Sequence, residues 1–160
     1  MYFYRFLREK ADNLHPSEID SDIEFYTSEE CGTNRDFTWN TPVKESMEAG
    51  QSVQLLFGME NLADAVKVLK CFACYKRVLA RFDISAVQST YTINFDEQVN
   101  ERVGSKYIMS DYNGNKITIP SECVQILSIS GWVDKSEARN VIGEIGALDE
   151  RQYEHLIENA

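Results

Sequence analysis

Long apolar runs and basic residues are both scarce in this chain of 160 residues. No uninterrupted apolar stretch approaches the roughly 20 residues that a membrane-spanning helix needs. The aromatic start of the chain is interrupted by Arg5, Arg8, Glu9 and Lys10, which is unlike the uncharged core of a secretory signal. We therefore expect a cytoplasmic protein that does not act at a membrane.

The shortage of basic residues also limits the possible partners. Lysine and arginine number 16 against 26 aspartates and glutamates, which gives a net charge of −10. This charge excludes a basic footprint for nucleic acid over the whole chain. Three prolines and eight glycines exclude collagen-like and low-complexity chains. A hydrophobic content of 43% excludes disorder, so residues 1–160 are expected to form one domain.

Cysteine is too infrequent for a disulfide-based scaffold, because only Cys31, Cys71, Cys74 and Cys123 are present. Cys71 and Cys74 form a CxxC pair, but the pair falls late in a predicted helix, whereas a redox-active pair opens one. A second ligand pair for zinc is missing from the sequence. We expect reduced thiols, no metal and no cofactor.

The hydrophobic periodicity predicts an α+β fold, a mostly antiparallel sheet of five to seven strands with one central helix and a helical C-terminus. Asn113-Gly114 favours a tight turn, which predicts a hairpin over residues 107–119. Further strands are predicted at residues 2–7, 52–58, 76–85, 89–95 and 122–130, and helices at 42–50, 61–75, 134–146 and 148–157.

An acidic segment interrupts this pattern at about residues 9–42. Between residues 9 and 30 it carries eight acidic side chains against one lysine, and its apolar content is thin. Turn-forming residues such as Pro16 and Gly32 predict a long irregular connection within the single domain.

The acidic segment is the strongest candidate for a binding surface. Closely spaced carboxylates can imitate nucleic acid in a basic groove, and nearby aromatic side chains can anchor a protein interface. The predicted partner-binding residues are Glu18, Asp20, Asp22, Glu24, Glu29, Glu30, Phe37 and Trp39. The sequence thus predicts an inhibitor, of the anti-defence or immunity type, of a basic protein such as a nucleic-acid-binding enzyme. It is not expected to bind nucleic acid directly.

Two other interpretations of the segment remain open. It could be a solvated loop that only keeps the protein soluble. Asp20, Asp22 and Glu24 alternate as in a calcium loop, but the glycine and glutamate that such a loop needs at its sixth and twelfth positions are missing.

An enzymatic alternative follows from the order of the predicted elements. An aromatic first strand with Arg5, a helix-to-strand unit, a Ser89-Thr90 strand and a late Lys-Ile-Thr-Ile-Pro segment resemble the layout of the ADP-ribosyltransferases. The resemblance implies NAD binding by Arg5 and Ser89, and a catalytic Glu97 or Glu122. The alternative function is therefore an ADP-ribosyltransferase-like enzyme or a degenerate nucleotide-binding domain. The sequence departs from the family where its glutamate is expected, since Asn115-Lys116 stands there.

The cysteine analysis yields a direct prediction. Thiol titration in denaturant should detect four free thiols, because none is expected to be in a disulfide or bound to a metal. Metal analysis should find less than about one tenth of an equivalent of zinc. Stoichiometric zinc would instead identify Cys71 and Cys74 as part of a structural metal site.

Overall fold

A computed structural model describes residues 1–9, 17–20, 22–24, 26–27, 54–72, 77–86, 92–95, 106–111 and 118–160. The predicted helix at 42–50 and the Asn113-Gly114 turn lie outside these residues.

The described strands form one antiparallel sheet of eight strands and a separate pair. The large sheet runs in the order β10-β9-β5-β1-β4-β7-β6, and β3 also pairs with β4. Its strands are β1 (Tyr2–Phe6), β3 (Tyr26–Thr27), β4 (Gln54–Met59), β5 (Leu79–Asp83), β6 (Thr92–Phe95), β7 (Lys106–Asp111), β9 (Val124–Ser128) and β10 (Gly131–Asp134). The pair consists of β2 (Ile23–Glu24) and β8 (Thr118–Ile119). The α+β prediction with an antiparallel sheet is confirmed.

Strand β1 lies at the centre of the large sheet. It pairs along its whole length with β5, from Tyr2 opposite Asp83 to Phe6 opposite Leu79, and its other edge pairs with β4. Because β4 and β5 both run antiparallel to β1, they run in the same direction as each other. Strands in the same direction need a crossover, and helix α2 (Leu62–Phe72) lies in this connection.

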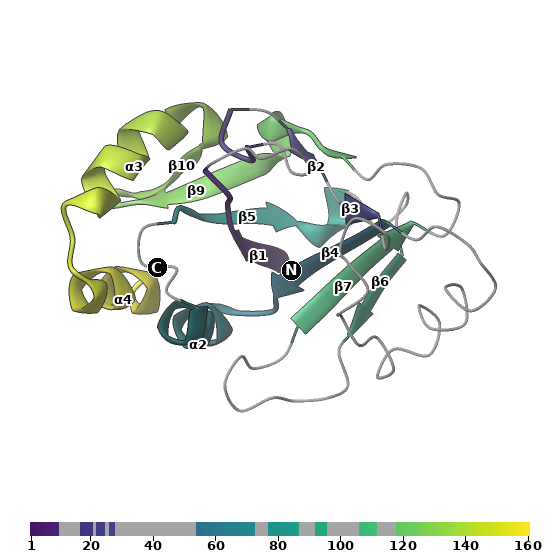
Figure 1. The fold of residues 1–160 in the computed structure, drawn as a ribbon, viewed down its shortest axis with the longest axis horizontal. Helices are drawn as coiled ribbons and strands as arrows, with labels where there is room; N and C mark the ends of the chain where they lie inside the picture. Colours follow the sequence, from purple (N-terminus) through teal and green to yellow (C-terminus); the bar gives the residue numbers. More distant parts are fainter. Residues whose placement is uncertain are drawn as a thin grey trace.

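The helices gather beside β1, β5 and β9, while β4, β7 and β6 fan away on the other side of Figure 1. Two helices follow the last strand, α3 (Ala138–Gly146) and α4 (Glu150–Glu158). A capping box between Asp149 and Gln152 starts α4. In the described residues, no helix combines the length and apolarity needed to span a bilayer.

Tyr153 fixes α4 to the sheet. Its buried hydroxyl accepts a hydrogen bond from the backbone N–H of Leu79 at 3.1 Å and donates one to the carbonyl of Arg77 at 2.6 Å. Its ring also packs edge-on against Phe6. The C-terminal helix is therefore held rigidly against the start of β5 by both polar and apolar contacts.

The structure corrects the predicted hairpin over residues 107–119. Strand β7 has β4 on one edge and β6 on the other, so β8 pairs with β2 instead. A hairpin joins β9 to β10, with Ser128 opposite Gly131. The hydrophobic periodicity had predicted only one strand in this region, at residues 122–130. Gly131 has a φ of 117°, a value that favours glycine, and this residue ends the turn.

One glycine is required by the packing of the core. The rings of Phe3 and Phe82 stack with their centroids 4.8 Å apart, and a Cβ atom on Gly58 would lie 2.1–2.6 Å from the Phe3 ring. Gly58 therefore makes room for Phe3 at the centre of the sheet.

Gly58→Ala should lower the free energy of unfolding by about 1–3 kcal/mol, because the added methyl group overpacks the core. Gly143→Ala is the matched control, since nothing lies within 4 Å of a Cβ at that position in α3. That variant should be more stable than the parent by about 0.5–1 kcal/mol. Urea denaturation measures both, and an unchanged stability of Gly58→Ala would contradict the close packing.

Candidate functional site

Glu18 lies in the interior although it belongs to the acidic segment. Its carboxylate is 1% exposed and accepts hydrogen bonds from Arg5 Nε at 2.8 Å and Nη2 at 3.0 Å. The backbone N–H of Arg8 donates to the same carboxylate at 3.0 Å, and Arg8 Nη2 lies 3.4 Å away. Burial alone would raise the pKa of Glu18, but the charges and hydrogen bonds of the two arginines hold it below its ordinary value.

Asp20 and Asp22 are exposed, but both are attached to the body of the domain. Asp20 binds the guanidinium of Arg139 in α3, and this hydrogen bonding lowers the pKa of Asp20. Asp22 accepts hydrogen bonds from the backbone N–H and the hydroxyl of Ser121, each at 2.9 Å. The backbone hydrogen bond is the main cause of the lowered pKa of Asp22.

A hollow of about 620 Å³ opens where this segment meets the two short 3-10 helices η3 (Ser121–Cys123) and η4 (Lys135–Glu137). Lys135 is 4% exposed, and its Nζ donates to Ser121 Oγ at 3.1 Å. Burial lowers the pKa of the Lys135 ammonium, although nearby carboxylates oppose this effect. The lining residues are Ile19, Asp20, Ser121, Glu122, Asp134, Lys135, Ser136, Ala138 and Arg139.

The structure changes the predicted binding surface. Glu18 is buried and bound by Arg5 and Arg8, so it is not accessible to a partner in this conformation. Asp20 and Asp22 are exposed, and the backbone of Glu24 pairs with Thr118 in the two-stranded sheet. The remaining predicted contacts, Glu29, Glu30, Phe37 and Trp39, lie outside the described residues.

The carboxylates of Asp20 and Asp22 bind Arg139 and Ser121, respectively. Among the residues that the structure describes, no cluster of three histidine, cysteine or acidic side chains could hold a metal ion.

Arg5, the residue that the ADP-ribosyltransferase resemblance assigns to NAD, directs two of its nitrogens to Glu18.

The remaining site residues of that resemblance are only partly described. Glu122 is exposed at the edge of the hollow, and Ser89 and Glu97 lie outside the described residues.

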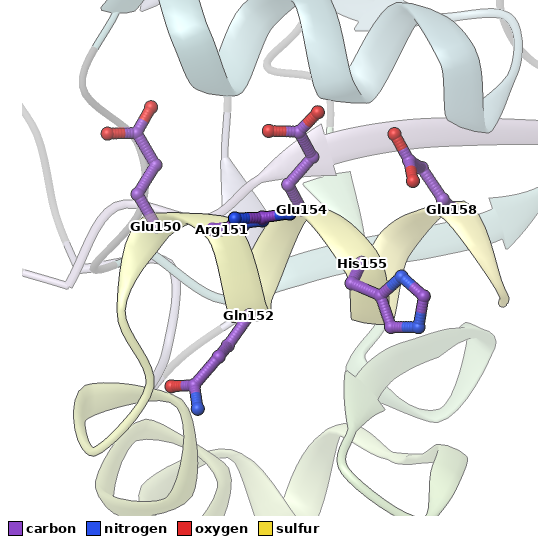
Figure 2. A pocket seen from close by; sticks show the side chains of 6 residues that line it. All are labelled: Glu150, Arg151, Gln152, Glu154, His155 and Glu158. Carbon is purple, nitrogen blue, oxygen red and sulfur yellow. The ribbon is translucent and has the colours of Figure 1, made fainter.

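A second acidic surface, which the sequence interpretation missed, lies on α4. Figure 2 shows Glu150, Glu154 and Glu158 pointing in one direction, toward α2, while Gln152 and His155 point the other way. These residues and Arg151 line a hollow of about 730 Å³. We define Glu150, Glu154 and Glu158 as the α4 acidic row. Their spacing of four residues was the available signal, because it places all three on one helix face.

One member of the α4 acidic row is paired within the domain. Lys70 of α2 binds Glu154 at 2.9 Å, and this hydrogen bond raises the pKa of Lys70. Glu150 and Glu158 add to the negative potential at the same lysine. Both are exposed at the two ends of the row, so their carboxylates are the more accessible ones.

The burial of Glu18 gives a stability prediction. Glu18→Gln should lower the free energy of unfolding by about 3 kcal/mol or more at neutral pH, because two partly buried arginines lose their shared carboxylate. Asp20→Asn is the control, and it should have a smaller effect because both Asp20 and Arg139 are more than half exposed.

The difference in unfolding free energy between the parent and Glu18→Gln should depend on pH. Because the pKa of Glu18 is lower in the folded than in the unfolded chain, its stabilisation is complete above the ordinary value of 4.5 and is lost as the pH falls through the folded value. The stability difference between parent and Glu18→Gln should therefore shrink in acid. A difference that is absent at neutral pH would contradict the buried ion pair.

Comparisons with protein-family models, with curated proteins and with solved structures find no match to this chain.

Proposed function

We propose that this protein is a small acidic binding module of the cytoplasm that inhibits a basic, nucleic-acid-handling protein. The observation that carries the proposal is the α4 acidic row, with its exposed ends at Glu150 and Glu158 on a helix fixed to the sheet. A chain of net charge −10 has a natural attraction to a basic surface, and this attraction speeds association.

The geometry of α4 suits such a role. Residues four apart on a helix are separated by about 6 Å along its axis, so the row presents regularly spaced negative charges. A basic groove that binds the phosphates of nucleic acid can accept charges of this kind. Because Tyr153 already holds the helix in place, little conformational freedom is lost on binding.

The rest of the C-terminal region reinforces the negative potential. Residues 118–160 carry eight acidic side chains and three basic ones. By contrast, the carboxylates of Glu18 and Asp20 are matched by Arg5, Arg8 and Arg139 within the domain. We therefore place the main electrostatic contact on α4. Phe37 and Trp39 remain the predicted aromatic anchors.

The test compares two variants with the same change in charge. The first, Glu150→Gln with Glu158→Gln, removes the exposed ends of the row and leaves the Lys70–Glu154 ion pair intact. The control, Glu122→Gln with Glu137→Gln, removes two exposed charges away from α4. The partner is first recovered from a host lysate at low salt and purified, and association rates are then measured at two salt concentrations.

At about 0.1 M salt the row variant should associate roughly ten-fold more slowly than the parent. The control should change the rate by less than about two-fold, because its charges lie outside the contact. At about 1 M salt the difference between the variants should disappear, since screening then acts within about 3 Å. Equal association rates for the row variant and the parent would contradict the proposed surface.

Inhibition is tested separately with the same purified partner. A labelled oligonucleotide bound to the partner should be displaced by the parent protein, and less effectively by the row variant. If the partner binds this protein and the oligonucleotide together, the binding module stands but the inhibitor assignment is wrong.

A further inference from the structure

Ser121, Lys135 and Asp22 form a cluster in which a hydroxyl lies between an amine and a carboxylate. Lys135 Nζ is 3.1 Å from Ser121 Oγ, within the range for a nucleophile and its base. Ser121 Oγ donates to Asp22 at 2.9 Å, and the backbone N–H of Ser121 donates to the same oxygen. The cluster joins distant parts of the chain, since Asp22 and Ser121 are 99 residues apart, whereas Ser121 and Lys135 are 14 apart.

The surroundings of the cluster favour chemistry at Ser121. Ser121 and Lys135 both line the hollow of about 620 Å³, so a small molecule can reach the hydroxyl. Lys135 itself is almost fully buried, and burial favours its uncharged form, whereas Asp22, Glu18 and Asp20 favour its ammonium. Arg139, Asp134 and Glu122 also line the hollow. Loss of the ammonium proton at alkaline pH converts Lys135 into a base next to Ser121 Oγ.

We propose that Ser121 is a nucleophile activated by Lys135, in a site that cleaves small polar esters. The Ser121 hydroxyl turns from Asp22 to donate to uncharged Lys135, which takes its proton as Oγ bonds to the carbonyl carbon of the ester. The bond from that carbon to the leaving oxygen breaks, and the leaving alcohol takes the proton from Lys135. Water then attacks the acyl-serine, which releases the acid and regenerates the hydroxyl.

The assigned substrate class follows from the lining of the hollow. Ile19 and Ala138 are its apolar residues, while charged or hydroxyl-bearing side chains make up the rest. Such a lining suits a short polar ester better than a long acyl chain. This activity is independent of the proposed binding function, because it uses none of the residues of the α4 acidic row.

The test uses an alkyl fluorophosphonate, from which an activated serine displaces fluoride and keeps the phosphonyl group. The parent protein should gain one phosphonyl group, located at Ser121 by peptide mass spectrometry, at a rate that rises in alkaline solution as Lys135 loses its proton. Ser121→Ala should not be labelled. Ser136→Ala, which changes another serine of the same hollow, should be labelled like the parent.

Lys135→Arg separates a base from a structural contact. Arginine keeps the positive charge and the hydrogen-bond donors, but it does not lose its proton in this pH range. We expect this variant to remain folded by circular dichroism and to be labelled at least about ten-fold more slowly than the parent, without the alkaline rise. Absence of labelling in the parent, equal labelling of Ser136, or an unchanged rate in folded Lys135→Arg would each overturn the proposal.

Discussion

The ion pair between Arg5 and Glu18 joins the centre of the sheet to the acidic segment, and much of the architecture around it depends on this contact. Arg5 lies on β1, where it pairs with Ala80 of β5, and the preceding residue Tyr4 pairs with Met59 of β4, so the strand is held on both edges. A carboxylate buried to 1% exposure is tolerable only with charged partners, which Arg5 and Arg8 supply. With Glu18 held in this place, Ile19 and Ile23 become buried, and Asp20 and Asp22 reach α3 and η3.

Among the described residues, two groups of carboxylates differ in their contacts. The carboxylates of residues 17–22 connect parts of the fold, because each one binds a named group of the domain. The carboxylates at the ends of the α4 acidic row, Glu150 and Glu158, have exposed side chains. The proposed inhibitor function therefore rests on the C-terminal helix, while the proposed chemistry of Ser121 arises where the acidic segment meets the C-terminal half.

The sequence was sufficient to predict the elements whose pattern is local. The spacing of Leu62, Ala65 and Leu69 in α2 and the stripe through Ala138, Val141 and Ile145 in α3 each identify a buried face. The aromatic residues of β1 identify the strand, but Phe3 and Tyr4 are both buried, so both of its faces are covered. The pairing of β8 with β2 could not be predicted in this way. Asn113-Gly114 favours a local hairpin, but occupation of both edges of β7 is a property of the whole sheet.

The candidate site was hard to predict for a similar reason. Eight acidic residues within a short segment suggest a solvated surface, and only a contact over 13 residues reveals that Glu18 is internal. A weak signal was present in Ile19 and Ile23, whose apolar side chains flank the acids and indicate that this part of the segment packs against the core. The spacing of Glu150, Glu154 and Glu158 in the sequence already places them on one helix face. The direction in which this face points depends on the way Tyr153 fixes α4 to the sheet.

Hydrogen exchange at the amides of Arg8 and Glu18 tests the central contact most directly. The Arg8 amide donates to the Glu18 carboxylate at 3.0 Å, and the Glu18 amide donates to the Arg8 carbonyl at 2.8 Å. Leu7, whose amide donates to the carbonyl of Val78 next to the ends of β1 and β5, serves as the internal reference. At neutral pH both amides should be protected to a degree comparable with Leu7. Exchange of both amides at the rate of an unfolded chain, with Leu7 still protected, would show that Glu18 is not held inside the fold.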